Sequence, residues 1–181
     1  MKTLPLLAAL LLLPVAAKAQ QAPDLDHAAG VYKHRFANGD VSGDHYTSED
    51  IFELVKVTAK TAYFRIHGEF YNGHECNISG MADLMPDALT YFGPLNFDKT
   101  PCVLKFTATA KGLRVQDVGD ACRMMDCGER GSFDSGADVA YPFAWRRPIR
   151  YMPRLLASTE YKAAVAEHDA HPIGTPAPAS Q

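Results

Sequence analysis

The stretch FYNGHECNISG, residues 70–80, interrupts an apolar segment with a turn and then continues into a cysteine. Asn72 and Gly73 both tolerate positive φ angles, and such a pair between two strand-like segments is a strong hairpin signal. The same stretch offers a histidine, a glutamate and a cysteine as reactive groups. We interpret it as a hairpin in which Cys76 forms a disulfide, so that no thiolate is free for catalysis.

Segments like those beside this turn recur through the middle of the chain. They are rich in β-branched and aromatic residues, are separated by Gly, Pro, Asn and Asp, and cover residues 51–57, 62–70, 76–82, 88–93, 102–110 and 113–118. An earlier strand is expected over residues 30–36, with a turn at Asn38 and Gly39. Alternation predicts that Phe64 and Ile66 share a buried face. The pattern predicts a mainly β fold, a small antiparallel meander forming a barrel or sandwich, with a C-terminal helix.

The two ends of the chain differ from this middle region. Residues 1–19 combine a positive charge, a short apolar run and an Ala-Lys-Ala cleavage pattern, which predict a signal peptide and a periplasmic or secreted protein. The run is too short for a membrane span, which needs about 20 apolar residues. A disulfide-bonded β domain is expected over residues 20–145 and an Arg-rich connector with a helix over residues 146–170. The helix itself is expected over residues 154–168, and residues 171–181 are expected to be a disordered tail.

The chain contains four cysteines, an even number that favours two disulfides over a metal site in an exported protein. A Lys-Gly pair lies midway between Cys102 and Cys122, and a hairpin turning there would bring these two cysteines together. That pairing leaves Cys76 to bond with Cys127. A local bridge between Cys122 and Cys127 is the alternative, and the spacing matches no common zinc pattern.

Charge is distributed unevenly along the chain. The formal net charge is −3, and removal of a signal peptide that contains only basic charges makes it more negative, so nucleic acid is not an expected partner. Residues 40–53 contain acidic but no basic side chains: Asp40, Asp44, Glu49, Asp50 and Glu53. Residues 144–156 contain basic but no acidic side chains: Arg146, Arg147, Arg150 and Arg154. These segments are two solvated faces or one segment packed on the other; alternatively, the acidic face attracts a basic partner.

No pattern typical of an enzyme site is visible. The serines lack a G-x-S-x-G context, and the histidines lack H-E-x-x-H or similar ligand spacing. We therefore predict a non-enzymatic protein with no catalytic residues, no metal site and no cofactor.

One short motif suggests a function: Ser42-Gly43-Asp44-His45-Tyr46. It resembles the S-G-x-x-Y loop of bacterial periplasmic lysozyme inhibitors, which are exported, disulfide-bearing, small antiparallel β proteins. The resemblance implies that the loop inserts into the cleft of a lysozyme, with Ser42 and Tyr46 as contact residues and Gly43 allowing a tight backbone. Asp44 and His45 occupy the variable positions. The acidic residues beside the motif would steer it to a basic lysozyme.

The leading hypothesis is therefore an exported inhibitor of a lysozyme-type muramidase that acts by loop insertion. A broader resemblance, carried by Asn-Gly-His before Cys76 and by residues 127–131, is to exported bacterial β proteins without a firm assignment. The alternative hypothesis is a structural or small-ligand-binding periplasmic β protein. In that case aromatic side chains would line a pocket: Tyr63, Phe64, Tyr91, Phe92 and Trp145.

Overall fold

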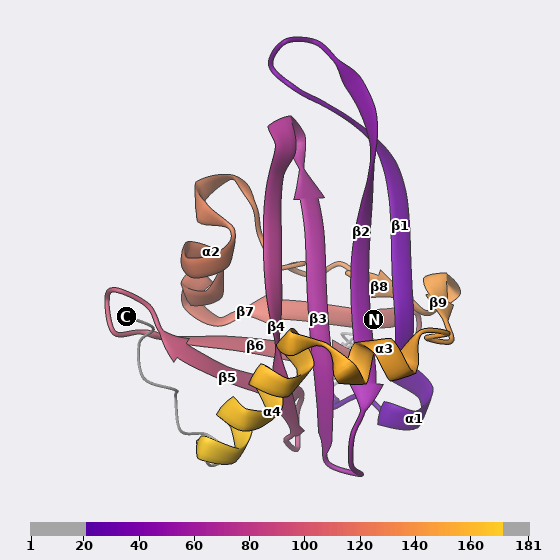
Figure 1. Cartoon of the computed structure of the whole chain (residues 1–181), viewed down its shortest axis with the longest axis vertical. Coiled ribbons are helices and arrows are strands. Elements are labelled where there is room, and N and C mark those ends of the chain that lie inside the picture. The colour runs from indigo at the N-terminus through magenta and orange to yellow at the C-terminus, as the bar shows by residue number, and fades with distance from the viewer. Residues whose placement is uncertain (1–20, 172–181) are drawn as a thin grey trace, which may run out of the picture.

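Each long strand of the protein pairs antiparallel with the strand that follows it in sequence (Figure 1). The computed structural model describes residues 21–171. The expected signal peptide, residue 20 of the expected β domain and all but residue 171 of the expected tail lie outside the described residues. The strands are β1 (Gly30–Gly39), β2 (His45–Lys56), β3 (Thr61–Phe70), β4 (His74–Leu84), β5 (Leu89–Leu95), β6 (Pro101–Ala108), β7 (Gly112–Asp117), β8 (Tyr141–Pro142) and β9 (Arg146–Arg147).

The helices are short and lie mostly toward the C-terminus. The α-helices are α1 (Leu25–Ala28), α2 (Ala121–Asp126), α3 (Met152–Ala157) and α4 (Thr159–Ala170). The 3-10 turns are η1 (Tyr71–Gly73), η2 (Val118–Asp120), η3 (Gly128–Arg130) and η4 (Phe143–Trp145).

The strand order in the sheet is β8-β7-β6-β5-β4-β3-β2-β1-β9. The short strands β8 and β9 are close neighbours in sequence, yet β8 pairs with β7 and β9 pairs with β1. Residues 141–147 therefore link the two edges of the sheet, which becomes nearly closed and barrel-like. In Figure 1, β5, β6 and β7 cross behind the upright strands β1 to β4. The prediction of a mainly β antiparallel meander with a C-terminal helix is confirmed.

The hairpin predicted from residues 70–80 is present. Phe70 pairs with His74, and the three residues between them form η1. Asn72 and Gly73 have positive φ angles of 63° and 67°. Cys76 is buried on β4 and forms a disulfide, so the stretch serves as a turn followed by a covalent link.

The prediction of a turn at Asn38 and Gly39 is wrong. Both residues belong to β1, Gly39 pairs with His45, and residues 40–44 form the turn. The physical reason is that the Asn38 side-chain amide donates a hydrogen bond to the Phe70 carbonyl at 3.1 Å. Asn38 thus links two strands and does not shape a turn.

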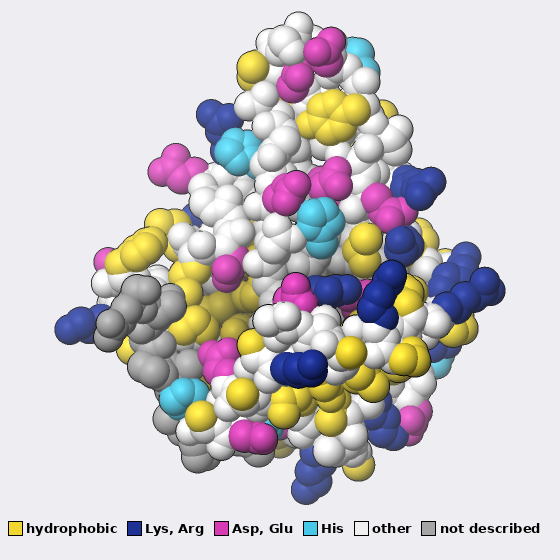
Figure 2. Space-filling view, viewed as in Figure 1, with side chains coloured by type: hydrophobic (Ala, Val, Ile, Leu, Met, Phe, Trp, Pro, Cys, Tyr) yellow, Lys and Arg dark blue, Asp and Glu magenta, His cyan; other side chains and the backbone are white. Residues whose placement is uncertain are grey.

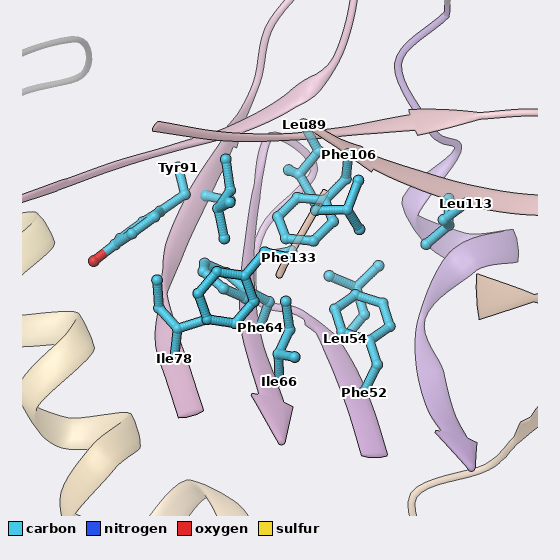
Figure 3. Close-up of a cluster of buried hydrophobic side chains, with 14 of the residues drawn as sticks. Phe52, Leu54, Phe64, Ile66, Ile78, Leu89, Tyr91, Phe106, Leu113 and Phe133 are labelled. Carbon is cyan, nitrogen blue, oxygen red and sulfur yellow. The ribbon is translucent and has the colours of Figure 1, made fainter. Parts of the chain in front are cut away.

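The interior is filled by alternate side chains from both halves of the sheet (Figure 3). Phe64 and Ile66 share this inner face, as predicted. The ring of Phe64 lies 5.0 Å from the ring of Phe106 and meets Tyr91 edge to face at 5.0 Å. These contacts tie the front strands to the crossing strands behind them, so the main core lies inside the sheet.

Helices α3 and α4 cover part of the outer face of the sheet (Figure 1). The expected single helix over residues 154–168 is interrupted at Ser158, whose hydroxyl accepts the Tyr161 N–H and caps α4. Leu155 and Ala164 are buried against the sheet, whereas Leu156 and Ala163 are exposed. The residues buried between sheet and helices are Val55, Tyr63, Met81, Leu155 and Ala164.

The disulfides confirm the predicted pairing. Cys76 is bonded to Cys127, and Cys102 is bonded to Cys122. The local bridge between Cys122 and Cys127 is absent, and the described chain contains no free cysteine. Cys122 lies in α2 and not on the strand opposite Cys102, so the helix that follows β7 carries it back to β6.

Removal of one bridge tests its contribution to stability. The Cys102–Cys122 bond spans 20 residues, and chain-entropy arguments assign a loop of that size about 3 kcal/mol. We expect the double variant Cys102→Ala, Cys122→Ala to lose about 3 kcal/mol of unfolding free energy in urea titrations. Peptide mapping of the unreduced wild-type protein is the control. An unchanged midpoint, with both bridges present in the wild type, would contradict the expectation.

Asp126, the last residue of α2, gives a prediction about pH. Burial raises the pKa of Asp126 to about 6, and the nearby Asp117 carboxylate adds to the shift. The folded protein thus binds this proton more tightly than the unfolded chain, so the contribution of Asp126 to stability falls as the pH rises from about 4 to 6. With allowance for solvent screening, Asp126→Asn should raise the unfolding free energy at pH 7.5 by about 1–2 kcal/mol and change it little at pH 4.

The measurement is urea unfolding at both pH values. Asp138→Asn replaces an exposed aspartate of the same chain and is the control, since it should change stability by less than about 0.5 kcal/mol. Equal behaviour of the two variants at pH 7.5 would show that the Asp126 carboxylate is not destabilised by the fold.

Candidate functional site

Two hairpins extend beyond the rest of the molecule (Figure 1). The backbone pairing of β2 with β3 ends at Ile51 and His67. Beyond that point, the ends of β1 and β2 stand beside the ends of β3 and β4. We call this part, residues 38–48 and 69–75, the projection. Figure 2 shows hydrophobic, acidic and histidine side chains on it.

Polar side chains hold the two hairpins of the projection together where the backbone ladder stops. The Asp50 carboxylate accepts the Glu69 N–H at 2.9 Å, and the Asn38 amide donates to the Phe70 carbonyl at 3.1 Å. These bonds satisfy backbone groups that would otherwise need water. The hairpins therefore form one unit and not two independent arms.

The turn at the end of the first hairpin is organised by Asp40. Its carboxylate accepts the Ser42 N–H at 2.9 Å, the Ser42 hydroxyl at 2.5 Å and the Asp44 N–H at 3.1 Å. The hydrogen bond from the Ser42 hydroxyl, helped by those from the loop amides, lowers the pKa of Asp40 below its usual value. Gly43 has a φ of 90°, which side chains rarely allow. The loop is thus held by its own hydrogen bonds.

The second hairpin supports this loop. The Tyr71 hydroxyl donates to the Asp40 carbonyl at 2.7 Å, and the Tyr46 hydroxyl accepts the Gly73 N–H at 3.0 Å. Tyr46 and Tyr71 each come from one hairpin and bond to the other. The two turns are therefore held against each other at the end of the projection.

Apolar surface is exposed at this end of the molecule. The exposed fractions are 76% for Val41, 57% for Tyr71 and 37% for Tyr46. An exposed set of one aliphatic and two aromatic side chains on a rigid element is typical of a surface that contacts a partner.

The structure places all five predicted loop residues, Ser42, Gly43, Asp44, His45 and Tyr46, at the end of the projection. Ser42, Gly43 and Asp44 form the turn, and His45 and Tyr46 begin β2. Ser42 and Tyr46 are both engaged in hydrogen bonds that hold the loop, so their structural role accompanies any contact with a partner.

Sequence reasoning named Asp40 only as an acid beside the motif and missed Val41 and Tyr71 as parts of this surface. In the sequence, Val41 lies between Asp40 and Ser42, and an apolar residue within such a polar turn indicates an exposed apolar side chain. The convergence of the turn at residues 40–44 with η1 was not available from local patterns, because it depends on how the two hairpins lie against each other.

Fewer free carboxylates are exposed than the acidic segment of residues 40–53 predicts. Glu49 forms ion pairs with Lys33 at 2.8 Å and Arg35 at 2.7 Å. Glu53 is buried, with an exposed fraction of 1%. Of the predicted acidic residues, Asp40 and Asp44 lie in the turn at the end of the projection, and the exposed Glu75 on β4 is a further carboxylate of the projection.

Two arginines of the basic segment, residues 144–156, have a structural role. The Arg146 guanidinium donates to the Ala29 carbonyl at 2.9 Å, and that of Arg147 donates to the Ala144 carbonyl at 2.8 Å. The Arg146 bond holds β9 to the residue before β1, and the Arg147 bond is local, to η4, so this part of the segment packs on the edge of the sheet.

The five aromatic residues of the alternative hypothesis do not share a pocket. Phe64 and Tyr91 pack in the core, whereas Tyr63 is buried on the opposite face beneath α3 and α4. Phe92 follows Tyr91 on β5 and Trp145 ends η4. A ligand site in this protein would need other residues.

Within residues 21–171, no three His, Cys, Asp or Glu side chains lie close enough together to hold a metal ion. None of the described helices combines the length and apolar character needed to cross a membrane. Two disulfides fit a protein of an oxidising compartment, periplasmic or extracellular.

Comparisons of the chain with protein-family models, with curated proteins and with solved structures find no match. The fold and the site define a two-disulfide antiparallel β protein whose nearly closed sheet carries a rigid two-hairpin projection.

The role of Asp40 leads to a prediction about loop order. In Asp40→Ala the amides of Ser42 and Asp44 lose their acceptor, so their hydrogen exchange should become about tenfold faster, with little change in global unfolding. Because the pKa of Asp40 is lowered in the folded loop, the order it confers should be lost as the pH falls through that pKa.

Asp44→Ala is the matched control, because the Asp44 carboxylate only approaches the Ser42 hydroxyl at 3.5 Å. Exchange at the Ser42 amide should stay near the wild-type rate in that variant. Exchange at Ser42 that is unchanged in Asp40→Ala would show that Asp40 does not hold the loop.

Proposed function

We propose that the protein is exported, is not itself an enzyme, and inhibits a lysozyme-type muramidase by inserting the end of the projection into the enzyme's cleft. The observation that carries this proposal is the loop of residues 40–44, held by Asp40 and supported by Tyr71 at the end of a narrow element. A loop that is ordered before binding avoids the entropy cost of ordering on contact, about 0.5–1.5 kcal/mol for each side chain.

The hydroxyl groups suit a cleft that binds sugars. The Ser42 hydroxyl donates to Asp40 and still has acceptor capacity, and the Tyr46 hydroxyl accepts from Gly73 and can still donate. Lysozyme-type enzymes place one carboxylic acid and one carboxylate beside the scissile bond. A hydroxyl that can accept and another that can donate match that pair of partners.

Surface charge and apolar area support the same kind of partner. Asp40 and Asp44 favour approach to a basic protein. The exposed Val41 and Tyr71 add apolar area around the loop, as expected of an interface core next to a polar contact.

Export is supported by two independent features. Residues 1–19 have the composition of a signal peptide, and the two disulfides need an oxidising compartment to persist. A periplasmic or secreted protein would meet muramidases that attack the cell wall from outside the cytoplasm.

The test is a turbidimetric assay of cell-wall lysis with the oxidised protein, beginning at residue 20, and a set of animal-type and other lysozymes. Ser42→Ala and Tyr46→Ala should each weaken inhibition about tenfold or more, the usual effect of truncating a central contact. Ser132→Ala changes an exposed serine outside the projection and should inhibit like the wild type.

Two results would overturn the proposal. One is no inhibition of any lysozyme by protein shown to be folded. The other is inhibition that the Ser42 and Tyr46 variants retain in full, because the projection would then not be the contact surface.

A further inference from the structure

A cleft separate from the projection lies on the outer face of the sheet, where α3 and α4 begin to cover it. Its volume is about 690 Å³, within the range of about 300–1,000 Å³ that is usual for small-molecule sites. We call it the outer cleft. Figure 2 shows this face, with acidic, basic and histidine side chains gathered between the projection and the helices.

The walls of the outer cleft come from neighbouring strands and from the helices. Register places Lys33, Ile51, His67 and Asn77 in one row across β1 to β4, and Glu53, Arg65 and Ser79 in the next. The C-terminal part of the chain adds Tyr151, Arg154 and Glu160.

A buried carboxylate fixes the geometry of the cleft. Glu53 has an exposed fraction of 1%, and one of its oxygens accepts a hydrogen bond from Arg65 while the other accepts one from the Tyr151 hydroxyl. A buried charge is costly unless it is paired in this way. Arg65 makes this bond with its Nε, and no hydrogen bond of its terminal nitrogens is found among the described residues, so these nitrogens are available to a ligand.

The charged side chains that line the cleft are three basic ones, Lys33, Arg65 and Arg154, and two acidic ones, Glu53 and Glu160. Arg154 lies 5.4 Å from the centre of the Tyr151 ring and has no ion pair within the described part of the chain. Burial opposes protonation of His67, but hydrogen bonds with Asn77 and Glu69 outweigh it and raise the pKa of His67. Arg65 is paired with Glu53 and Lys33 with Glu49, so Arg154 is the basic side chain of the cleft wall without an ion pair in the described structure. The raised pKa of His67 adds to the positive character of this wall. An anionic group is the favoured ligand.

The remaining polar groups suit hydroxyls. Asn77 and Ser79 lie side by side with His67 and Arg65 on the cleft wall, and Glu160 faces them from α4. Amide, hydroxyl and carboxylate groups can donate to and accept from several hydroxyls, while the Tyr151 ring offers a flat surface. We propose that the outer cleft binds a small acidic saccharide, with its carboxylate between Arg65 and Arg154 and its hydroxyls on Asn77, Ser79 and Glu160.

The experiment is an NMR titration of the oxidised ¹⁵N-labelled protein with N-acetylmuramic acid and with glucuronic acid. Saturable shifts are expected at the amides of Lys33, Arg65, Asn77 and Ser79, and not in residues 40–46. N-acetylglucosamine, which has no carboxylate, should bind at least about tenfold more weakly, the usual effect of losing a charge-assisted hydrogen bond.

Arg154→Ala tests the location of the site. This side chain is exposed and makes no ion pair in the described structure, so the variant should fold and bind either acid about tenfold more weakly. Arg150→Ala removes an exposed arginine four residues earlier that does not line the cleft, and it should bind like the wild type. Ser42→Ala should also bind normally, which separates this result from muramidase inhibition.

Three outcomes would overturn the proposal: no saturable shift with either acid, equal affinity for the neutral sugar, or equal affinity in the Arg154 and Arg150 variants. Shifts confined to residues 40–46 would place any sugar binding on the projection instead.

Discussion

The link between the two edges of the sheet is the constraint on which the remaining structure depends. Pairing of β8 with β7 and of β9 with β1 lets one short segment close the sheet, so that little strand edge is left for pairing with other chains. The backbones of the paired strands lie close together at both edges of the sheet. A Cβ at Gly112 would lie 2.3 Å from the Tyr141 carbonyl oxygen, and one at Gly30 would lie 2.8 Å from that of Arg147. Closure therefore requires glycine on both β7 and β1.

Unequal strand lengths turn this closed sheet into a body with a projection. Strands β1 to β4 have 10, 12, 10 and 11 residues, whereas β5, β6 and β7 have 7, 8 and 6. The excess length of the front strands has no crossing strand to pack against, so apolar packing cannot hold it. Polar side chains such as Asn38, Asp50 and Tyr71 do so instead, and the end of the molecule gains order from hydrogen bonds.

Much of this fold could be predicted from the sequence, because alternation and turn residues report local structure directly. Phe64 and Ile66 showed the inner face of β3, and Asn72 with Gly73 showed a turn whose φ angles are both positive. Errors arose where a residue is used by a distant part of the chain. Asn38 looks like a turn residue, yet its amide bonds a carbonyl 32 positions away.

The loop at the end of the projection could be predicted from the sequence, whereas the outer cleft could not, because the cleft combines residues that are far apart in the chain. The motif at residues 42–46 is contiguous, so sequence alone could propose it. The outer cleft joins Glu53, Arg65 and Tyr151, and the hydrogen bond from Tyr151 to Glu53 spans 98 positions. In the sequence, Glu53 is one of several acids in a charged segment. Only the packing of the residues before α3 against β2 shows that it is buried and paired.

The arrangement of charges allows the projection and the outer cleft to bind different partners, although both lie on strands β1 to β4. Between them, Glu49 forms ion pairs with Lys33 and Arg35. Asp40 and Asp44 at the projection and Arg154 in the outer cleft form no ion pair within the described residues. Asp44 and Glu53 are nine positions apart along the chain, or about 30 Å at the usual rise of about 3.3 Å per residue of a strand. That distance exceeds the screening length of about 8 Å at physiological ionic strength. A cationic partner at the projection and an anionic ligand in the outer cleft would therefore bind with little mutual interference.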